Sequence, residues 1–285
     1  MNRREFCKFL FLLPTLSFSF NACQAKDKKL INLNPEEVLF QQKIKWAINN
    51  SLEKKPLNII ILELAKSFLN APYEAGTLDL YNTETERLII NLHSFDCFTF
   101  LETVLALARC IKKQKTTFAD HKRELEFIRY RNGKLTNYES RLHYFSEWIL
   151  NGSQKRIVKL INGPDLIQKP IFYLSQNSAT AKNNQLIQDS EKKLSSLKLP
   201  SFNCLSLQNP SQLALLQEGD IIGFTSNIEG LDINHVGFLI KKPDQTLSFI
   251  HASSRNQKVE IYKDSLANYC SSLKSNSGIL VARPF

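Results

Sequence analysis

The stretch Ser94-Phe95-Asp96-Cys97-Phe98-Thr99-Phe100 decides how this 285-residue chain is expected to fold. Serine and aspartate are preferred helix N-caps, so Asp96 is predicted to begin a helix. Apolar residues then recur at helical spacing on one face. Cys97 would therefore lie at a helix start, where unpaired N–H groups and the helix dipole favour a thiolate. We expect the position to lower the thiol pKa.

The order of the remaining elements predicts an α+β fold. Helical patterns dominate the first two thirds of the chain, and strand patterns with polar turns follow. This order favours helices packed on a C-terminal antiparallel sheet. The predicted helices span residues 35–49, 57–69, 97–108, 118–130, 140–150 and 189–197, and the predicted strands 88–92, 219–224, 236–240, 247–251, 259–262 and 279–282.

Composition and charge limit the classes of function. The chain is 43% hydrophobic and 22% charged, which is typical of a globular protein with an ample core, and its formal charge is +10. The basic residues are scattered, and no nucleic-acid-binding motif accompanies them. A solvated basic surface or an anionic polymer partner such as the cell wall fits this charge. We expect no nucleic-acid partner.

The N-terminus reads as a targeting segment. A charged start is followed by an uncharged, mostly apolar run over residues 9–20, the length of a secretory signal and too short for a comfortable membrane span. Arg3-Arg4 resembles a twin-arginine signal, and Phe20-Asn21-Ala22-Cys23 resembles a lipobox. We therefore predict a signal peptide over 1–22, a linker over 23–35 and export to the periplasm or cell envelope. Whether Cys23 carries a lipid anchor stays open.

Export affects how the other cysteines are interpreted, because an oxidising compartment favours disulfides. Cys110 falls within the helix that Cys97 opens and is expected to be a small buried apolar residue. The sequence leaves open whether Cys204 and Cys270 pair.

Two downstream histidines, His235 and His251, fall in strand-like settings. A histidine beside Cys97 could take the thiol proton, and a second polar residue could orient that histidine. A metal site built from these three residues and His93 is the alternative. The chain lacks the tight spacing typical of such sites, so no metal and no cofactor are predicted.

Four stretches in this order resemble the NlpC-type papain-like cell-wall hydrolases. They are Asp96-Cys97-Phe98-Thr99-Phe100, Gly219-Asp220-Ile221-Ile222, His235-Val236-Gly237-Phe238 and Ile250-His251-Ala252-Ser253. A loop upstream, Pro72-Tyr73-Glu74-Ala75-Gly76, resembles the family loop whose tyrosine lies beside the nucleophile. Residues 96–102, 130–134 and 138–145 are similar to one branch, the N-acetylmuramoyl-L-alanine amidase-like proteins. The resemblance spans roughly residues 57–285 and implies a papain-like domain over 36–285, with a helical insertion at about 115–200.

The resemblance also implies roles for individual residues. Cys97 would be the nucleophile, His235 the general base, and His251 the residue that orients His235. Tyr73 would hold the scissile carbonyl or line the groove. Asp96 would cap the helix, and the Cys97 N–H is a natural oxyanion donor.

Three residues of the insertion have two interpretations. Arg141, His143 and Tyr144 would contact the sugar or stem peptide of peptidoglycan, or they would belong to a packed aromatic helix with a structural arginine. The sequence does not choose between these.

The implied activity is an exported cysteine hydrolase acting on peptidoglycan or muropeptides, by way of a thioester at Cys97. The amidase-like branch indicates the bond between N-acetylmuramic acid and L-alanine. One alternative is the bond between D-glutamate and the diamino acid of the stem peptide. A non-catalytic cell-wall-binding protein is the alternative from another class, although all three chemical residues are present. The oligomeric state stays open.

Overall fold

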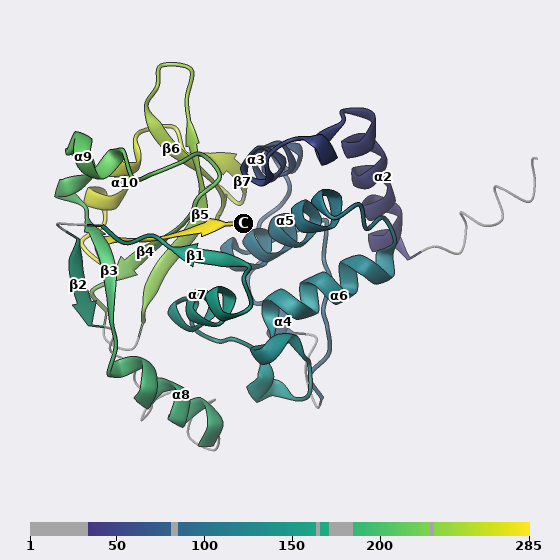
Figure 1. Cartoon of the computed structure of the whole chain (residues 1–285), viewed down its shortest axis with the longest axis horizontal. Coiled ribbons are helices and arrows are strands. Elements are labelled where there is room, and N and C mark those ends of the chain that lie inside the picture. Colours follow the sequence, from purple (N-terminus) through teal and green to yellow (C-terminus); the bar gives the residue numbers. More distant parts are fainter. Residues whose placement is uncertain (1–33, 81–84, 164–165, 171–184, 229–230) are drawn as a thin grey trace, which may run out of the picture.

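The computed structural model describes residues 34–80, 85–163, 166–170, 185–228 and 231–285 (Figure 1). The α-helices are α2 (Pro35–Asn49), α3 (Leu57–Ser67), α4 (Thr77–Leu80), α5 (Cys97–Lys112), α6 (Phe118–Arg129), α7 (Phe145–Gln154), α8 (Gln185–Ser195), α9 (Pro210–Leu213) and α10 (Leu266–Ser272). The strands are β1 (Val158–Leu160), β2 (Ile167–Pro170), β3 (Lys198–Asn203), β4 (Ile221–Ser226), β5 (Ile233–Lys241), β6 (Leu247–Ser253), β7 (Lys258–Ile261) and β8 (Asn276–Pro284).

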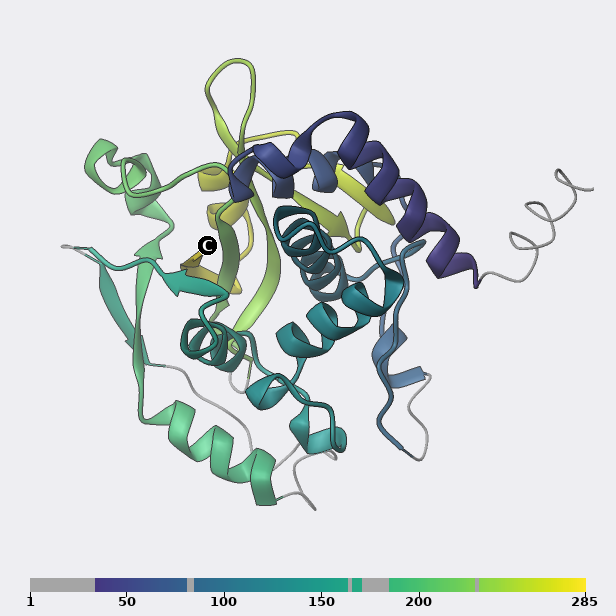
Figure 2. The same ribbon diagram turned by 45° about the vertical axis from the view of Figure 1, so that its right-hand side comes forward.

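One antiparallel sheet organises the molecule. Its strands follow the order β2-β3-β8-β4-β5-β6-β7, and β1 pairs with β8 beside this path. Figures 1 and 2 show the large helices α2, α3, α5 and α6 gathered on one side of the sheet and α10 on the other. The fold is therefore α+β, with helices packed on a C-terminal antiparallel sheet, as the sequence predicted.

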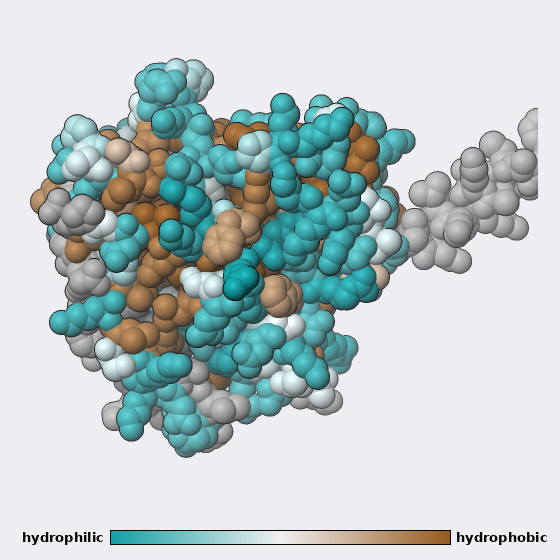
Figure 3. Space-filling view, viewed as in Figure 1, coloured by the Kyte–Doolittle hydropathy of each residue, from teal (hydrophilic) through white to brown (hydrophobic). Residues whose placement is uncertain are grey.

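Alternation along the central strands produces two cores. Successive strand residues point to opposite faces, so Ile221 joins the core under α5 while Ile222 joins the core under α10. Every residue of β4 is buried, because both faces of this strand are covered. In the space-filling view the apolar atoms gather over the sheet, whereas the surface over α5 and α6 is mostly hydrophilic (Figure 3).

Helix α5 is the central element of the helical layer. All residues from Thr99 to Ile111 are buried, and Phe100 meets Phe238 of β5 with ring centroids 6.0 Å apart. Its buried charges are paired with α6: Arg129 Nε donates to Glu102 Oε2 at 2.7 Å. This rigid packing fixes where the N-terminus of α5 lies relative to the sheet.

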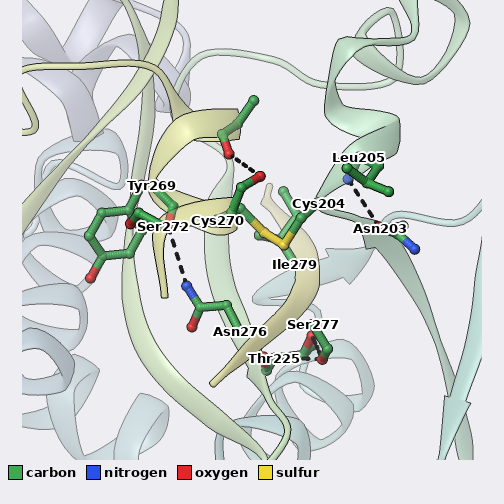
Figure 4. The surroundings of a disulfide bond; sticks show 12 residues. Asn203, Cys204, Leu205, Thr225, Tyr269, Cys270, Ser272, Asn276, Ser277 and Ile279 are labelled. Carbon is green, nitrogen blue, oxygen red and sulfur yellow. Dashed lines mark hydrogen bonds between the residues drawn. A yellow bond between two sulfur atoms is a disulfide. The ribbon is translucent and has the colours of Figure 1, made fainter. Parts of the chain in front are cut away.

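A disulfide joins Cys204, just after β3, to Cys270 of α10 (Figure 4). The pairing that the sequence left open is therefore present, and it links α10 covalently to the residue that follows β3. Cys110 is buried in α5 as expected.

Several predicted elements need correction. Residues 88–92 form no strand: they have no regular secondary structure, and Arg129 donates from Nη1 to the Ile89 carbonyl. The predicted helix over 140–150 begins only at Phe145, because Arg141 forms a bridge with Tyr130 before it. The insertion predicted as helical also contains the strands β1, β2 and β3.

The N-terminal predictions fall outside the described residues. The signal peptide over 1–22, the acylation of Cys23 and most of the linker over 23–35 concern residues before Asn34. Among the described helices, none combines the length and apolar character needed to cross a membrane.

Candidate active site

Cys97 is held in place by the cap that precedes it. The Asp96 carboxylate accepts hydrogen bonds from the N–H groups of Phe98 at 3.0 Å and Thr99 at 2.7 Å, and the Thr99 hydroxyl accepts from the Asp96 N–H at 3.0 Å. Asp96 therefore caps the helix as predicted, and Thr99 completes a capping box. The Cys97 N–H lies at the start of α5, where it can also donate to an incoming oxyanion.

The surroundings of Cys97 favour a protonated thiol at rest, whereas a thiolate was expected. Burial, then the Asp96 charge, raise the pKa of the Cys97 thiol to about 12. The N–H groups of Val236, Cys97 and Phe98 act in the opposite direction and lower the pKa, but they do not outweigh burial. The resting site therefore holds a neutral thiol, and the predicted lowering of its pKa is wrong in sign. A base must take the proton during attack.

The two predicted histidines do lie together. His235 on β5 and His251 on β6 place Nε2 and Nδ1 only 2.6 Å apart. Gly237 makes this closeness possible, since a Cβ there would lie 2.8 Å from the Ile250 carbonyl oxygen. The Val236 N–H faces the Cys97 sulfur, so β5 also brings its neighbour His235 to the start of α5. The paired histidines thus lie on strands beside the start of α5, and His235 directly precedes the residue whose N–H faces the Cys97 sulfur.

Burial keeps both imidazoles neutral. It lowers the pKa of His235 to about 3, with a further contribution from His251, and it lowers the pKa of His251 to about 4. A neutral imidazole has one protonated and one free ring nitrogen. Because Nε2 of His235 is engaged by His251, Nδ1 is the nitrogen left to accept the thiol proton.

A pocket of about 440 Å³ opens beside the histidines. Its wall combines aromatic rings with basic and acidic side chains. It is lined by His235, His251, Ser253, Ser254, Arg255, Asn256, Glu260, Tyr262, Lys263, Tyr269, Ser272 and Leu273.

Tyr73 lies beside the cysteine, as the resemblance implied. Its segment pairs with Phe95, and Glu74 N–H donates to the Phe95 carbonyl at 3.0 Å. Burial, then the charges of Cys97 and Asp96, raise the pKa of the Tyr73 hydroxyl. The hydroxyl therefore stays protonated and can donate a hydrogen bond to a bound carbonyl.

Tyr269 is a site residue that the sequence prediction missed. Its ring centroid lies 6.1 Å from His235 and 6.2 Å from His251, and burial together with the Cys97 charge raises its pKa to about 12. Tyr269 projects from α10 away from the Cys204–Cys270 disulfide (Figure 4). No local signal in the sequence indicates Tyr269, because the short helix α10 was not predicted.

The three insertion residues lie in other surroundings. Arg141 is buried against Asp79 at 2.6 Å and Glu86 at 3.4 Å. His143 Nε2 lies 3.0 Å from the Tyr138 carbonyl oxygen, and burial lowers its pKa to about 4. Tyr144 donates to Glu191. None of the three lines the pocket beside the histidines. Their packing favours the structural interpretation, and their contact with substrate stays a prediction.

Among the described residues, no group of three or more His, Cys, Asp or Glu side chains is arranged to hold a metal ion. His93 lies instead beside Glu36 at 3.8 Å.

The comparisons decide the family. The family profile described as N-acetylmuramoyl-L-alanine amidase-like matches residues 63–279. The chain belongs to the N-acetylmuramoyl-L-alanine amidase-like family. Membership indicates a hydrolase of amide bonds in peptidoglycan, and it agrees with the branch that the motifs resembled. A search of curated protein sequences gave no match.

Solved structures of similar proteins support this membership. An N-acetylmuramoyl-L-alanine amidase from Bacteroides uniformis is 30% identical with a TM-score of 0.71, over 80% of this chain and 98% of that one. A Bacteroides fragilis protein that carries a provisional xylanase name is 36% identical with a TM-score of 0.69, over 78% and 99%. A Legionella pneumophila protein, 20% identical over 93% and 97% with a TM-score of 0.61, shares the fold of this amidase-like chain.

Proposed function

We propose that this protein is a cysteine amidase that cleaves the bond between N-acetylmuramic acid and L-alanine. The observation that carries the proposal is the His235–His251 pair, which lines an open pocket and lies on the strands beside Cys97, in a chain of the amidase-like family. The name of the Bacteroides uniformis relative supports this choice of bond.

The geometry suggests the following steps. Nδ1 of His235 takes the proton from the Cys97 thiol as sulfur attacks the amide carbonyl. The Cys97 N–H stabilises the oxyanion, and the Tyr73 hydroxyl is a second donor. The His235 imidazolium then protonates the leaving L-alanine amine, and a thioester remains on Cys97. Water attacks this thioester with His235 again as base, which releases the muramic acid carboxylate and restores the thiol.

The pocket wall suits the acidic stem peptide. Arg255 and Lys263 line it, and neither side chain has an ion-pair partner within 4.0 Å among the described residues. Stem peptides carry free carboxylates, which bind to such cations. The net charge of +10 also favours an anionic wall polymer.

A glycosidase is less consistent with this pocket. Such enzymes commonly use two carboxylates on opposite sides of the scissile bond. Of the described residues that line the pocket, Glu260 is the one carboxylate. The xylanase name of the Bacteroides fragilis protein therefore gains no support from this site.

The test is mass spectrometry of defined muropeptides after incubation with the protein lacking residues 1–22. Products with a free L-alanine amine are expected from the wild type and from Cys110→Ala, whose thiol is buried elsewhere in α5. Cys97→Ala is expected to yield none. Fragments that end at D-glutamate would establish the endopeptidase instead. Binding without cleavage by the wild type would favour a wall-binding protein.

We also propose export to the cell envelope. The Cys204–Cys270 disulfide supports this proposal, because stable disulfides are rare in reducing cytosol. The intact mass of the protein purified from its cell envelope tests it. Loss of residues 1–22 with an acylated Cys23 would indicate a lipid anchor, and loss without acylation a soluble exported form. Recovery of the protein only from the cytosol, with an intact N-terminus, would refute export.

A further inference from the structure

The second histidine of the pair has a buried nitrogen without a partner. His251 directs Nδ1 toward His235, while its Nε2 is buried and has no hydrogen-bond partner among the described residues. A carboxylate oxygen of Glu260, Oε1, lies 3.8 Å from this nitrogen. Buried polar atoms are nearly always paired, so the neighbouring carboxylate is significant.

The position of Glu260 follows from strand register. His251 on β6 and Glu260 on β7 are directly opposite each other in the antiparallel pair, so their side chains share one face of the sheet. Asn256 Nδ2 donates to Glu260 Oε1 at 2.7 Å and holds the carboxylate near the pocket. The side chain of Glu260 is 18% exposed. A shift of about 1 Å brings Oε1 within hydrogen-bonding distance of His251 Nε2.

Two arrangements of the ring protons are compatible with the hydrogen bond between His235 and His251. In the first, His235 carries its proton on Nε2 and donates to His251 Nδ1, so His251 carries its own proton on Nε2, and His235 Nδ1 is free. In the second, His251 donates from Nδ1, and the His235 proton moves to its own Nδ1. Only the first arrangement lets His235 accept the proton of Cys97.

We propose that Glu260 is a positioning residue that holds the His251 proton on Nε2 and so keeps Nδ1 of His235 as the proton acceptor for Cys97. This proposal rests on the proposed function, which assigns His235 as the base. The carboxylate attracts the Nε2–H dipole of His251, and it also stabilises the positive charge that appears on His235 when Cys97 loses its proton.

The other groups around His251 do not select this arrangement. The Tyr262 ring, just after β7, lies 6.5 Å away, and from α10 the Tyr269 ring lies 6.2 Å away. Burial raises the pKa of both hydroxyls, so they are neutral in the working range. Arg255 and Lys263 line the same pocket but are cations, which repel an N–H proton. Glu260 is the anion on this wall within the described residues.

Kinetics of Glu260→Ala, Glu260→Gln and Glu260→Asp on a defined muropeptide test the proposal. Glu260→Ala should lower kcat about 10- to 100-fold with KM within twofold of wild type. The acid limb of its pH profile should move to lower pH, because a removed negative charge makes the histidine pair harder to protonate. Glu260→Gln keeps an acceptor and should lose less kcat, and Glu260→Asp should recover most of it. Glu63→Ala, an exposed carboxylate on α3, is the matched control.

A second measurement keeps the two proposals separable. Nitrogen-15 NMR of the imidazoles should place the His251 proton on Nε2 in the wild type and show a mixture of tautomers in Glu260→Ala. A proton on Nδ1 of His251, or a Glu260→Ala enzyme with wild-type kcat and pH profile, would overturn the role of Glu260. If the wild type cleaves no muropeptide, the proposed function fails, and the NMR result still decides the tautomer.

Discussion

At the scale of single residues, Asp96 combines two opposing effects on Cys97. Its side chain caps α5 and so presents the N–H groups that favour a thiolate. Its negative charge, second only to burial, raises the pKa of the same thiol. A cap needs an acceptor oxygen but no charge, so the two effects can be separated by substitution.

Asp96→Asn should lower the Cys97 pKa and leave the free energy of unfolding nearly unchanged, because asparagine caps about as well as aspartate. Asp96→Ala should lower the free energy of unfolding by about 1 kcal/mol through loss of the cap. The pH dependence of iodoacetamide alkylation at Cys97 and urea unfolding provide the measurements. Equal stability of the two variants, or an unchanged alkylation profile for Asp96→Asn, would contradict this account.

The sequence was informative about residues whose signal is local. Asp96, Cys97 and the two histidines each sit in a short pattern with a physical reason, and the structure caps α5 with Asp96 and pairs His235 with His251. Tyr269 and Glu260 gave no such signal, because their relation to the site arises from strand register and from a helix of seven residues. The resting state of the thiol was mispredicted because burial, the largest influence on its pKa, is not visible in a helix-start motif.

At the scale of elements, α10 depends on its disulfide. The helix has seven residues, too few to be stable alone. It contributes Leu266 and Cys270 to the core on its side of the sheet, and the bond to Cys204 joins it to the end of β3. The same helix supplies Tyr269 to the pocket wall. The disulfide that holds α10 in place therefore also holds this part of the wall in place.

The Cys204→Ala/Cys270→Ala double variant should therefore lower the free energy of unfolding by about 2–4 kcal/mol. It should also raise KM for the muropeptide, since Tyr269 is held less firmly. Urea unfolding with and without reductant provides the measurement, and reductant should destabilise the wild type but not the double variant. Stability that is equal in all four samples would refute the role of the crosslink.

Element prediction succeeded where the hydrophobic period was long and clear. The long helix α5 and the strands β4 to β8 were found, because each buries a regular face. The segment over residues 88–92 has the composition of a strand but is held by a side chain of α6, and β1 has only three residues. Tertiary contacts determine the conformation of such short segments, and these contacts cannot be read from composition alone.

At the scale of the whole molecule, buried histidines link stability to pH. His121 is packed between Phe40 and Phe118, with centroids 5.3 Å and 6.1 Å away, and neither ring nitrogen has a partner in the described structure. Burial lowers its pKa to about 3. The histidine pKa in the unfolded chain is near 6.5. Between about pH 6.5 and pH 3, His121 is therefore protonated in the unfolded chain but neutral in the native state. Stability is present above about pH 6.5 and falls as the pH decreases toward 3.

His121→Phe should flatten this dependence. Between pH 6.5 and pH 4 the wild type should lose on the order of 1 kcal/mol per pH unit more than the variant. Urea unfolding at pH 7, 5.5 and 4.5 measures the difference, with His93→Gln as the control at an exposed histidine. Parallel pH dependences for wild type and His121→Phe would show that His121 is not a source of acid sensitivity.

The raised pKa of Cys97 has a consequence for how the thiol withstands oxidation. Peroxides oxidise thiolates, and a cysteine kept as a thiol reacts slowly. Cys110 is thirteen positions further along α5, about 20 Å away by helix rise, and the remaining pair is already crosslinked. No resolving thiol is thus available within the described chain to rescue a sulfenic acid at Cys97. A raised pKa therefore slows the oxidation of a thiol that has no resolving partner among the described residues.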